Sequence, residues 1–201
     1  MTWSAAASVS PPPQQESLRS AFSAARAGTF SESERLGLKS NPLLPWLDAI
    51  QFKQQIAQAD NTQALNLIKQ HPDDPSSAWL ISQWRAELIK RQDWPAAQAW
   101  LERYPDDSAG SRCAQLLARE PQARNTAWTQ NALAIWINEV KPPSHCNDLF
   151  AALQQSGALG DTQAWQRFDL LLAENASNAM SEPIAFMTPV AAILAKSYVA
   201  F

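Results

Sequence analysis

The chain has 201 residues, of which 46% are hydrophobic and 17% charged, and this composition excludes disorder over most of its length. It contains only 5 glycines, which disfavours turn-rich β folds and glycine-rich phosphate loops. A formal net charge of −3 argues against nucleic acid as a partner. No apolar run of about 20 residues occurs, so no membrane span is expected. The composition therefore favours an all-α fold.

Residues 1–14 are rich in serine, alanine and proline and end in a run of three prolines, which predicts a flexible leader that becomes a stiff spacer. Ala5 to Ala7 resemble the end of a secretory signal, but the basic residues and the long apolar core of a signal are missing. Either no signal is present or the sequence begins downstream of it. Helical patterns start at Glu16, and Gly28 is expected to end the first helix.

Two consecutive segments share one register at an offset of 33 residues. Each has a helix opened by a proline, a polar turn, a shorter helix and a Pro-Asp-Asp break. The matching pairs are Pro42 with Pro75, Trp46 with Trp79, Leu47 with Leu80, Ile56 with Ile89, Asp60 with Asp93, Ala64 with Ala97, and Ile68 with Leu101. A helix pair repeated at this period is typical of tetratricopeptide-like solenoids. The fold class predicted is all-α, a right-handed α-superhelix of helix-turn-helix repeats.

The repeat domain is expected over residues 15–177, with weaker copies after Asp106. Residues 178–201 depart from the pattern, which predicts a divergent C-terminal segment that is truncated or poorly ordered. Because solenoid repeats bury their apolar faces against neighbours, the segment from Ile184 to Val199 must either cover the last repeat or stay disordered.

Tryptophans at repeat positions are expected to fill the space between stacked helices, and stacking on a sugar or another ligand is the alternative. These are Trp46, Trp79, Trp100 and Trp128. The paired carboxylates Asp73-Asp74 and Asp106-Asp107 could flank a glycosidic bond. They occupy equivalent positions just before a new helix, however, where aspartates cap free amides.

No catalytic residue, cofactor site or metal site is predicted. His71 stands at the end of a helix without a serine or cysteine partner nearby. No glycine-rich phosphate loop, G-x-S-x-G elbow or H-E-x-x-H motif occurs. His145 beside Cys146 supplies too few ligands for zinc. An all-α enzyme with an unrecognised site is a further hypothesis.

Two cysteines, Cys113 and Cys146, stand 33 residues apart. In a cytosolic protein they would be two buried thiols, and in an exported protein they would form one disulfide. Closing a loop of this size would stabilise the fold by about 3–4 kcal/mol in the chain-entropy model.

The segment from Asn41 to Ile56 (NPLLPWLDAIQFKQQI) resembles the N-terminal region of the soluble lytic transglycosylases, in which a Y-P-L-x-P-Y-L segment opens a long α-superhelix. The stretch LIKRQDW, residues 88–94, is similar to the family's L-x-R-R-x-D-W turn. Cys113 and Cys146 match the family's two cysteines and their separation, and CNDLF from Cys146 with Ser156-Gly157 resembles its C-D-x-L-F and S-G stretch. The resemblance covers about residues 15–175.

The resemblance implies a periplasmic protein of peptidoglycan turnover with a disulfide between Cys113 and Cys146. The family's enzymes follow a U-shaped α-superhelix with a linker domain and a lysozyme-like catalytic domain, in which one Glu acts as acid and then base and releases a 1,6-anhydromuramoyl product. The family's E-S, G-L-M-Q and A-Y-N-x-G catalytic motifs have no counterpart here, since Glu16-Ser17 lacks the downstream partners. No catalytic residue is therefore carried over, and the chain alone is not expected to be an enzyme.

Two functions follow as hypotheses. The first is a non-catalytic superhelical fragment of a lytic transglycosylase that acts as a scaffold or guides peptidoglycan glycan strands. The second is a tetratricopeptide-like adaptor that binds a partner protein on its concave face. An oxidised Cys113–Cys146 pair favours the first, and free thiols favour a cytosolic adaptor.

Overall fold

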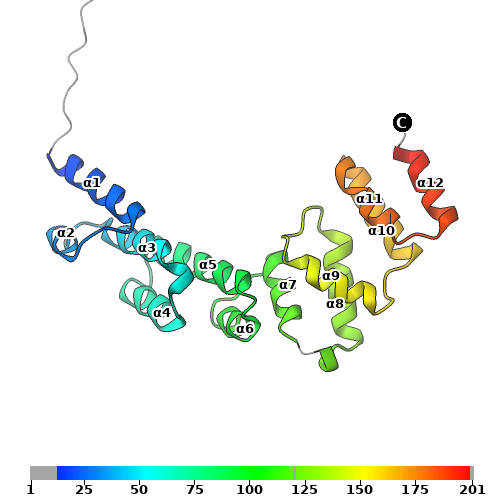
Figure 1. Cartoon of the computed structure of the whole chain (residues 1–201), viewed down its shortest axis with the longest axis horizontal. Coiled ribbons are helices and arrows are strands. Elements are labelled where there is room, and N and C mark those ends of the chain that lie inside the picture. The colour runs from blue at the N-terminus through cyan, green and yellow to red at the C-terminus, as the bar shows by residue number, and fades with distance from the viewer. Residues whose placement is uncertain (1–12, 120, 200–201) are drawn as a thin grey trace, which may run out of the picture. The chain divides into compact units, whose positions relative to one another are not determined.

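The computed structural model describes residues 13–119 and 121–199, and every regular element in these ranges is a helix (Figure 1). The all-α fold class predicted from the sequence is confirmed. The predicted flexible leader lies outside the described residues, apart from Pro13 and Gln14, which begin the first helix.

The chain divides into two compact units, Met1–Glu87 and Leu88–Phe201, here called the N-terminal and the C-terminal unit. The boundary falls inside helix α5 (Pro75–Lys90). The predicted repeat domain, 15–177, thus contributes to both units, each of which has its own apolar cores.

The N-terminal unit contains five α-helices among its described residues. They are α1 (Pro13–Ala27), α2 (Glu32–Gly37), α3 (Leu44–Gln54), α4 (Asn61–Gln70) and the greater part of α5. As predicted, α1 ends at Gly28, which takes a positive φ of 74° that a side chain would disfavour. The amide of Thr29 then donates to the carbonyl of Ala24 at 2.9 Å and closes the helix end.

Apolar packing holds these helices together. Helix α1 packs against α3 through a buried cluster of five side chains: Ala21, Ala25, Phe30, Leu44 and Leu47. Trp84 of α5 is 1% exposed and lies edge-on to Phe52 of α3, with ring centroids 6.0 Å apart. Its indole N–H donates to the side chain of Asn61 at 2.7 Å, so one tryptophan joins three helices.

Helix α2 was not predicted from the sequence. Its start carries a capping box, in which Ser31 accepts from the amide of Glu34 and the Glu34 carboxylate accepts from the amide of Ser31. The S-x-x-E pattern that marks such a box is present in the sequence. The helix was missed because it buries no side chain and so has no apolar period.

The predicted 33-residue register places residues of matching burial in both copies. Leu47 and Leu80 are 0% and 2% exposed, and Ala64 and Ala97 are both 0% exposed. Asp60 is the N-cap of α4, and the matching Asp93 is the N-cap of α6 (Trp94–Arg103). Equivalent positions therefore serve the same structural purpose in both copies, as a repeat requires.

The C-terminal unit contains seven further α-helices in the described part of the chain. These are α6, α7 (Ala109–Leu117), α8 (Thr126–Asn138), α9 (Cys146–Gln155), α10 (Asp161–Ala173), α11 (Ser181–Ile184) and α12 (Pro189–Val199). Helix α7 packs against α6, α8 and α9, and α8 packs against α9 and α10. An apolar core lies among α7, α8 and α9 and includes Trp128 and Trp136, which are 2% and 0% exposed.

A buried arginine joins three helices of this unit. Arg167 of α10 is 2% exposed and donates to the carbonyl oxygens of Trp136 and Glu139 and, from Nε, to the carboxylate of Glu182 at 2.8 Å. The Trp136 indole donates to the other oxygen of the same carboxylate at 2.9 Å. A buried charge is tolerated when it is paired and hydrogen-bonded in this way.

The C-terminal segment predicted as divergent, 178–201, holds α11 and α12. Glu182 comes from this segment, and Ala195 of α12 is buried in a cluster with Phe168, Leu171 and Met180. Helix α12 therefore covers part of the apolar face of α10, which is one of the two outcomes expected from the sequence. Truncation and low order of this segment stay predictions.

Candidate functional site

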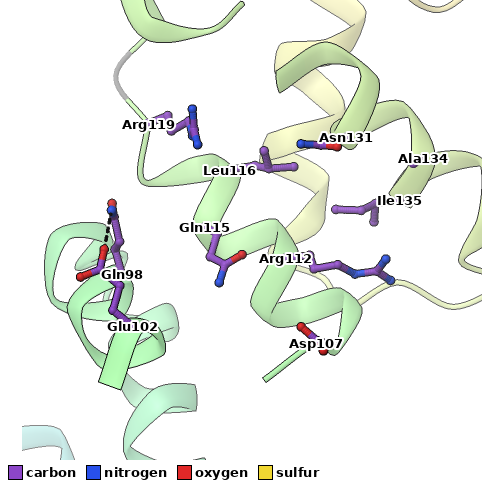
Figure 2. A pocket seen from close by; sticks show the side chains of 10 residues that line it. All are labelled: Gln98, Glu102, Asp107, Arg112, Gln115, Leu116, Arg119, Asn131, Ala134 and Ile135. Carbon is purple, nitrogen blue, oxygen red and sulfur yellow. Dashed lines mark hydrogen bonds between the residues drawn. The ribbon is translucent and has the colours of Figure 1, made fainter. Parts of the chain in front are cut away.

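A groove of about 460 Å³ lies among α6, α7 and α8 in the C-terminal unit (Figure 2). Most of its lining side chains are polar and exposed, while Leu116 and Ile135 are buried and form an apolar floor. The lining residues are Gln98, Glu102, Asp107, Arg112, Gln115, Leu116, Arg119, Asn131, Ala134 and Ile135. We refer to this site as the α6–α8 groove.

Each helix contributes one face to the groove. Gln98 and Glu102 stand four residues apart on α6 and are hydrogen-bonded to each other at 3.0 Å. Arg112 and Gln115 stand three residues apart on α7, so both lie on the same face of that helix. Asn131 comes from α8, on the opposite side of the groove from α6 (Figure 2).

The two arginines of the groove differ in their partners. Arg112 donates to the carboxylate of Glu139, the residue that ends α8, at 2.6 Å. This ion pair ties α7 to the end of α8 and holds the Arg112 guanidinium in place. Arg119 follows the end of α7, is exposed, and has no ion pair with any residue in the ranges 13–119 and 121–199. A guanidinium carries five N–H donors, and no ion pair to the described residues engages those of Arg119.

A disulfide supports the helix that forms the middle of the groove. Cys113 of α7 and Cys146 at the start of α9 are joined by a disulfide, and both residues are 0% exposed. Beside the bridge, Nε2 of His145 lies 2.9 Å from the carbonyl oxygen of Gly110, also on α7. The bond is the one that the resemblance implied, and it fixes α7 against α9 while Arg112 and Gln115 face the groove.

The paired carboxylates behave as caps and surface groups. Asp74 accepts from the amide of Ser76 at 2.8 Å, and this hydrogen bonding from Ser76 lowers the pKa of Asp74. In the second pair Asp106 accepts from the hydroxyl of Ser108, and Ser108 itself caps α7. Capping by aspartate therefore holds for the first pair, whereas a serine caps the helix after the second. Asp107 instead lines the α6–α8 groove.

None of the four tryptophans singled out from the sequence lines this groove. Trp100 and Trp128 are 3% and 2% exposed and belong to the core, as expected. Trp46 and Trp79 are half-buried and pack on each other, with ring centroids 5.8 Å apart. Their bulk thus contributes to helix packing.

The described residues include no group of three His, Cys, Asp or Glu side chains that could hold a metal ion. His71 ends α4, where its amide donates to the carbonyl of Ile68 at 3.2 Å. None of the helices described combines the length and hydropathy needed to cross a membrane.

Sequence reasoning missed the groove as a site. Gln98, Gln115, Arg119 and Asn131 each fit the polar face of an amphipathic helix, and such residues are normally solvated. Only their convergence from three helices makes them a candidate site, and no spacing within one helix indicates that convergence.

No family model matches the chain. Curated proteins named soluble lytic murein transglycosylase, from Escherichia coli K12 and Salmonella typhimurium, are 26% and 25% identical to it over 121 residues. That match covers 60% of this chain and 19% of each relative, so the chain spans about a fifth of their length.

Two solved structures of a 70-kDa soluble lytic transglycosylase match 93% of the chain and 30% of their own length. One is a complex with bulgecin A, with a TM-score of 0.74 at 20% identity, and the other is from Escherichia coli, with a TM-score of 0.75 at 21% identity. The resemblance expected from the sequence is thereby confirmed: the chain is similar in sequence to soluble lytic murein transglycosylases and shares the helical fold of part of their structure.

Proposed function

We propose that this chain is a non-catalytic helical scaffold related to the lytic transglycosylases, which binds and guides the glycan strands of murein in the periplasm. The observation that carries the proposal is the α6–α8 groove, in which amide, guanidinium and carboxylate side chains surround an apolar floor. Sugars present hydroxyl and acylamino groups at their edges and C–H groups on their faces, and this groove offers partners for both.

The groove lacks the setting that a glycosidic acid needs. A carboxyl that protonates a leaving oxygen near neutral pH is normally buried among apolar side chains. Glu102 and Asp107 are exposed, and Glu102 accepts a hydrogen bond from Gln98 at 3.0 Å. This arrangement supports binding of a glycan without cleavage.

The disulfide supports a periplasmic location. Buried disulfides persist in oxidising compartments, whereas cytosolic thiols are kept reduced. The Cys113–Cys146 bridge therefore fits an exported protein better than the alternative, a cytosolic adaptor of tetratricopeptide type.

Incubation of the oxidised chain with purified murein sacculi tests the proposal. The expected result is saturable cosedimentation with the sacculi and no release of 1,6-anhydromuropeptides, measured by chromatography of the soluble fraction. Release above the level of a heat-denatured control would contradict the non-catalytic assignment. Absence of cosedimentation would contradict the guiding role and favour the adaptor.

A further inference from the structure

The α6–α8 groove contains one arginine without an ion pair, and two side-chain amides without a hydrogen bond, among the described residues. Arg119 has no ion pair among the described residues, and the side chains of Gln115 and Asn131 make no hydrogen bond to any of them. By contrast, Arg112 pairs with Glu139 and Gln98 bonds Glu102, so these four side chains are already engaged. The lining groups without a partner among the described residues are thus one guanidinium, two amides and the carboxylate of Asp107.

These groups are arranged along the groove. Arg119 extends from the end of α7 on the side opposite Asn131 of α8, Leu116 lies between these two sides, and Gln115 points from α7 away from Asn131 (Figure 2). Gln115 lies in the last turn of α7, and Arg119 follows two residues after Leu117, where the helix ends. Amides of this kind can both donate to and accept from an acylamino group, and a guanidinium binds a carboxylate through two parallel hydrogen bonds.

We infer that the α6–α8 groove binds a carboxylate-bearing strand of N-acylated amino sugars, with Arg119 holding the carboxylate and with Gln115 and Asn131 holding acylamino groups. This rests on the proposed function and names the ligand chemistry of the same site. In murein the carboxylate has two sources, the lactyl group of a sugar that carries no peptide and the peptide attached to the other sugars. Arg119 binds the carboxylate that both sources provide. Leu116 and Ile135 supply the apolar surface against which the faces of the sugars pack.

The test compares Arg119→Gln with Arg26→Gln, which removes the same charge from the end of α1 in the N-terminal unit. Binding of each oxidised variant is measured by cosedimentation with intact sacculi and with chitin, a neutral N-acetylated glycan. Binding to the soluble glycan strands that an amidase frees of their peptides is measured by calorimetric titration. Arg119→Gln is expected to weaken binding to sacculi about tenfold, the loss typical of one charged hydrogen-bond partner. Arg26→Gln is expected to bind like the parent chain.

Further binding measurements distinguish the two sources of the carboxylate and the roles of the amides. Chitin is expected to bind more weakly than sacculi, with the same affinity for the parent chain and for Arg119→Gln. If the defect of Arg119→Gln persists with the peptide-free glycan strands, the lactyl group is the source of the carboxylate. If it appears only with intact sacculi, the peptide is the source. The double variant Gln115→Ala with Asn131→Ala is expected to weaken binding to chitin and sacculi alike.

Equal binding of the parent chain and Arg119→Gln to intact sacculi and to the peptide-free glycan strands would overturn this inference while leaving the proposed function intact. Failure of the parent chain to bind any sacculus would overturn both. Circular dichroism of each variant confirms the helical fold, which substitution of these exposed side chains is expected to leave unchanged.

Discussion

The two units of the chain hold similar helices together by different means. In the N-terminal unit the helices are joined by apolar and aromatic contacts, and the ion pair between Arg35 and Asp48 leaves the arginine side chain 34% exposed. In the C-terminal unit a disulfide joins α7 to α9, and Arg167, 2% exposed, joins α8, α10 and α11. The candidate groove lies in the unit with these stronger constraints, where binding groups on three helices can be held in place with less loss of entropy.

Removing the disulfide should produce the largest difference between the units. The variant Cys113→Ala with Cys146→Ala is expected to lower the free energy of unfolding of the C-terminal unit by about 3–4 kcal/mol in the chain-entropy model. Hydrogen exchange should accelerate in α7 and α9 and stay unchanged in α1 and α3. Equal acceleration in both units would show that they unfold together.

The two carboxylates that pair with arginines, Glu182 and Asp48, should contribute unequally to the free energy of unfolding. Glu182→Gln leaves a buried Arg167 without its counter-charge and is expected to cost about 1.5–3 kcal/mol. Asp48→Asn leaves Arg35 able to turn to water and is expected to cost less. Denaturant unfolding of both variants checks the order, and a larger loss for Asp48→Asn would contradict the account of Arg167.

Matched helix caps provide a smaller test at equivalent repeat positions. Asp60→Ala and Asp93→Ala each remove a side chain that caps the next helix, and each is expected to cost about 1 kcal/mol. The loss of stability should be larger for Asp60→Ala, because the cap at Asp60 is completed by Gln63 in a capping box. Thermal unfolding of the two variants measures the difference, and a clearly larger loss for Asp93→Ala would contradict it.

The smallest expected effect is on how the free energy of unfolding depends on pH in the acid range. Hydrogen bonds from Ser31 lower the pKa of Glu34, and those from Ser76 lower the pKa of Asp74, both in the N-terminal unit. Because the folded-state pKa lies below the unfolded value of about 4, the stabilisation is present above that pH and is lost as pH falls through the folded-state pKa. Ser31→Ala should reduce the acid dependence of unfolding measured between about pH 5 and pH 2. An unchanged dependence would contradict the cap of α2.

Much of the fold could be predicted because it depends on local patterns. The 33-residue register anticipated the buried Leu47 and Leu80 and the caps at Asp60 and Asp93, since matching helix pairs place matching residues. Arg167 could not be predicted as a core residue, because its burial depends on carbonyl groups of α8 and on Glu182, which is distant in sequence. The groove escaped prediction for the same reason, as its binding groups meet only in the folded unit.

Hydrogen exchange of the oxidised chain with and without soluble, uncrosslinked murein strands tests the central claim most directly. The account predicts slower exchange in peptides that cover α6, α7 and α8, and no change in α1 to α4. Unchanged exchange throughout at saturating strand concentration, or protection confined to the N-terminal unit, would contradict it.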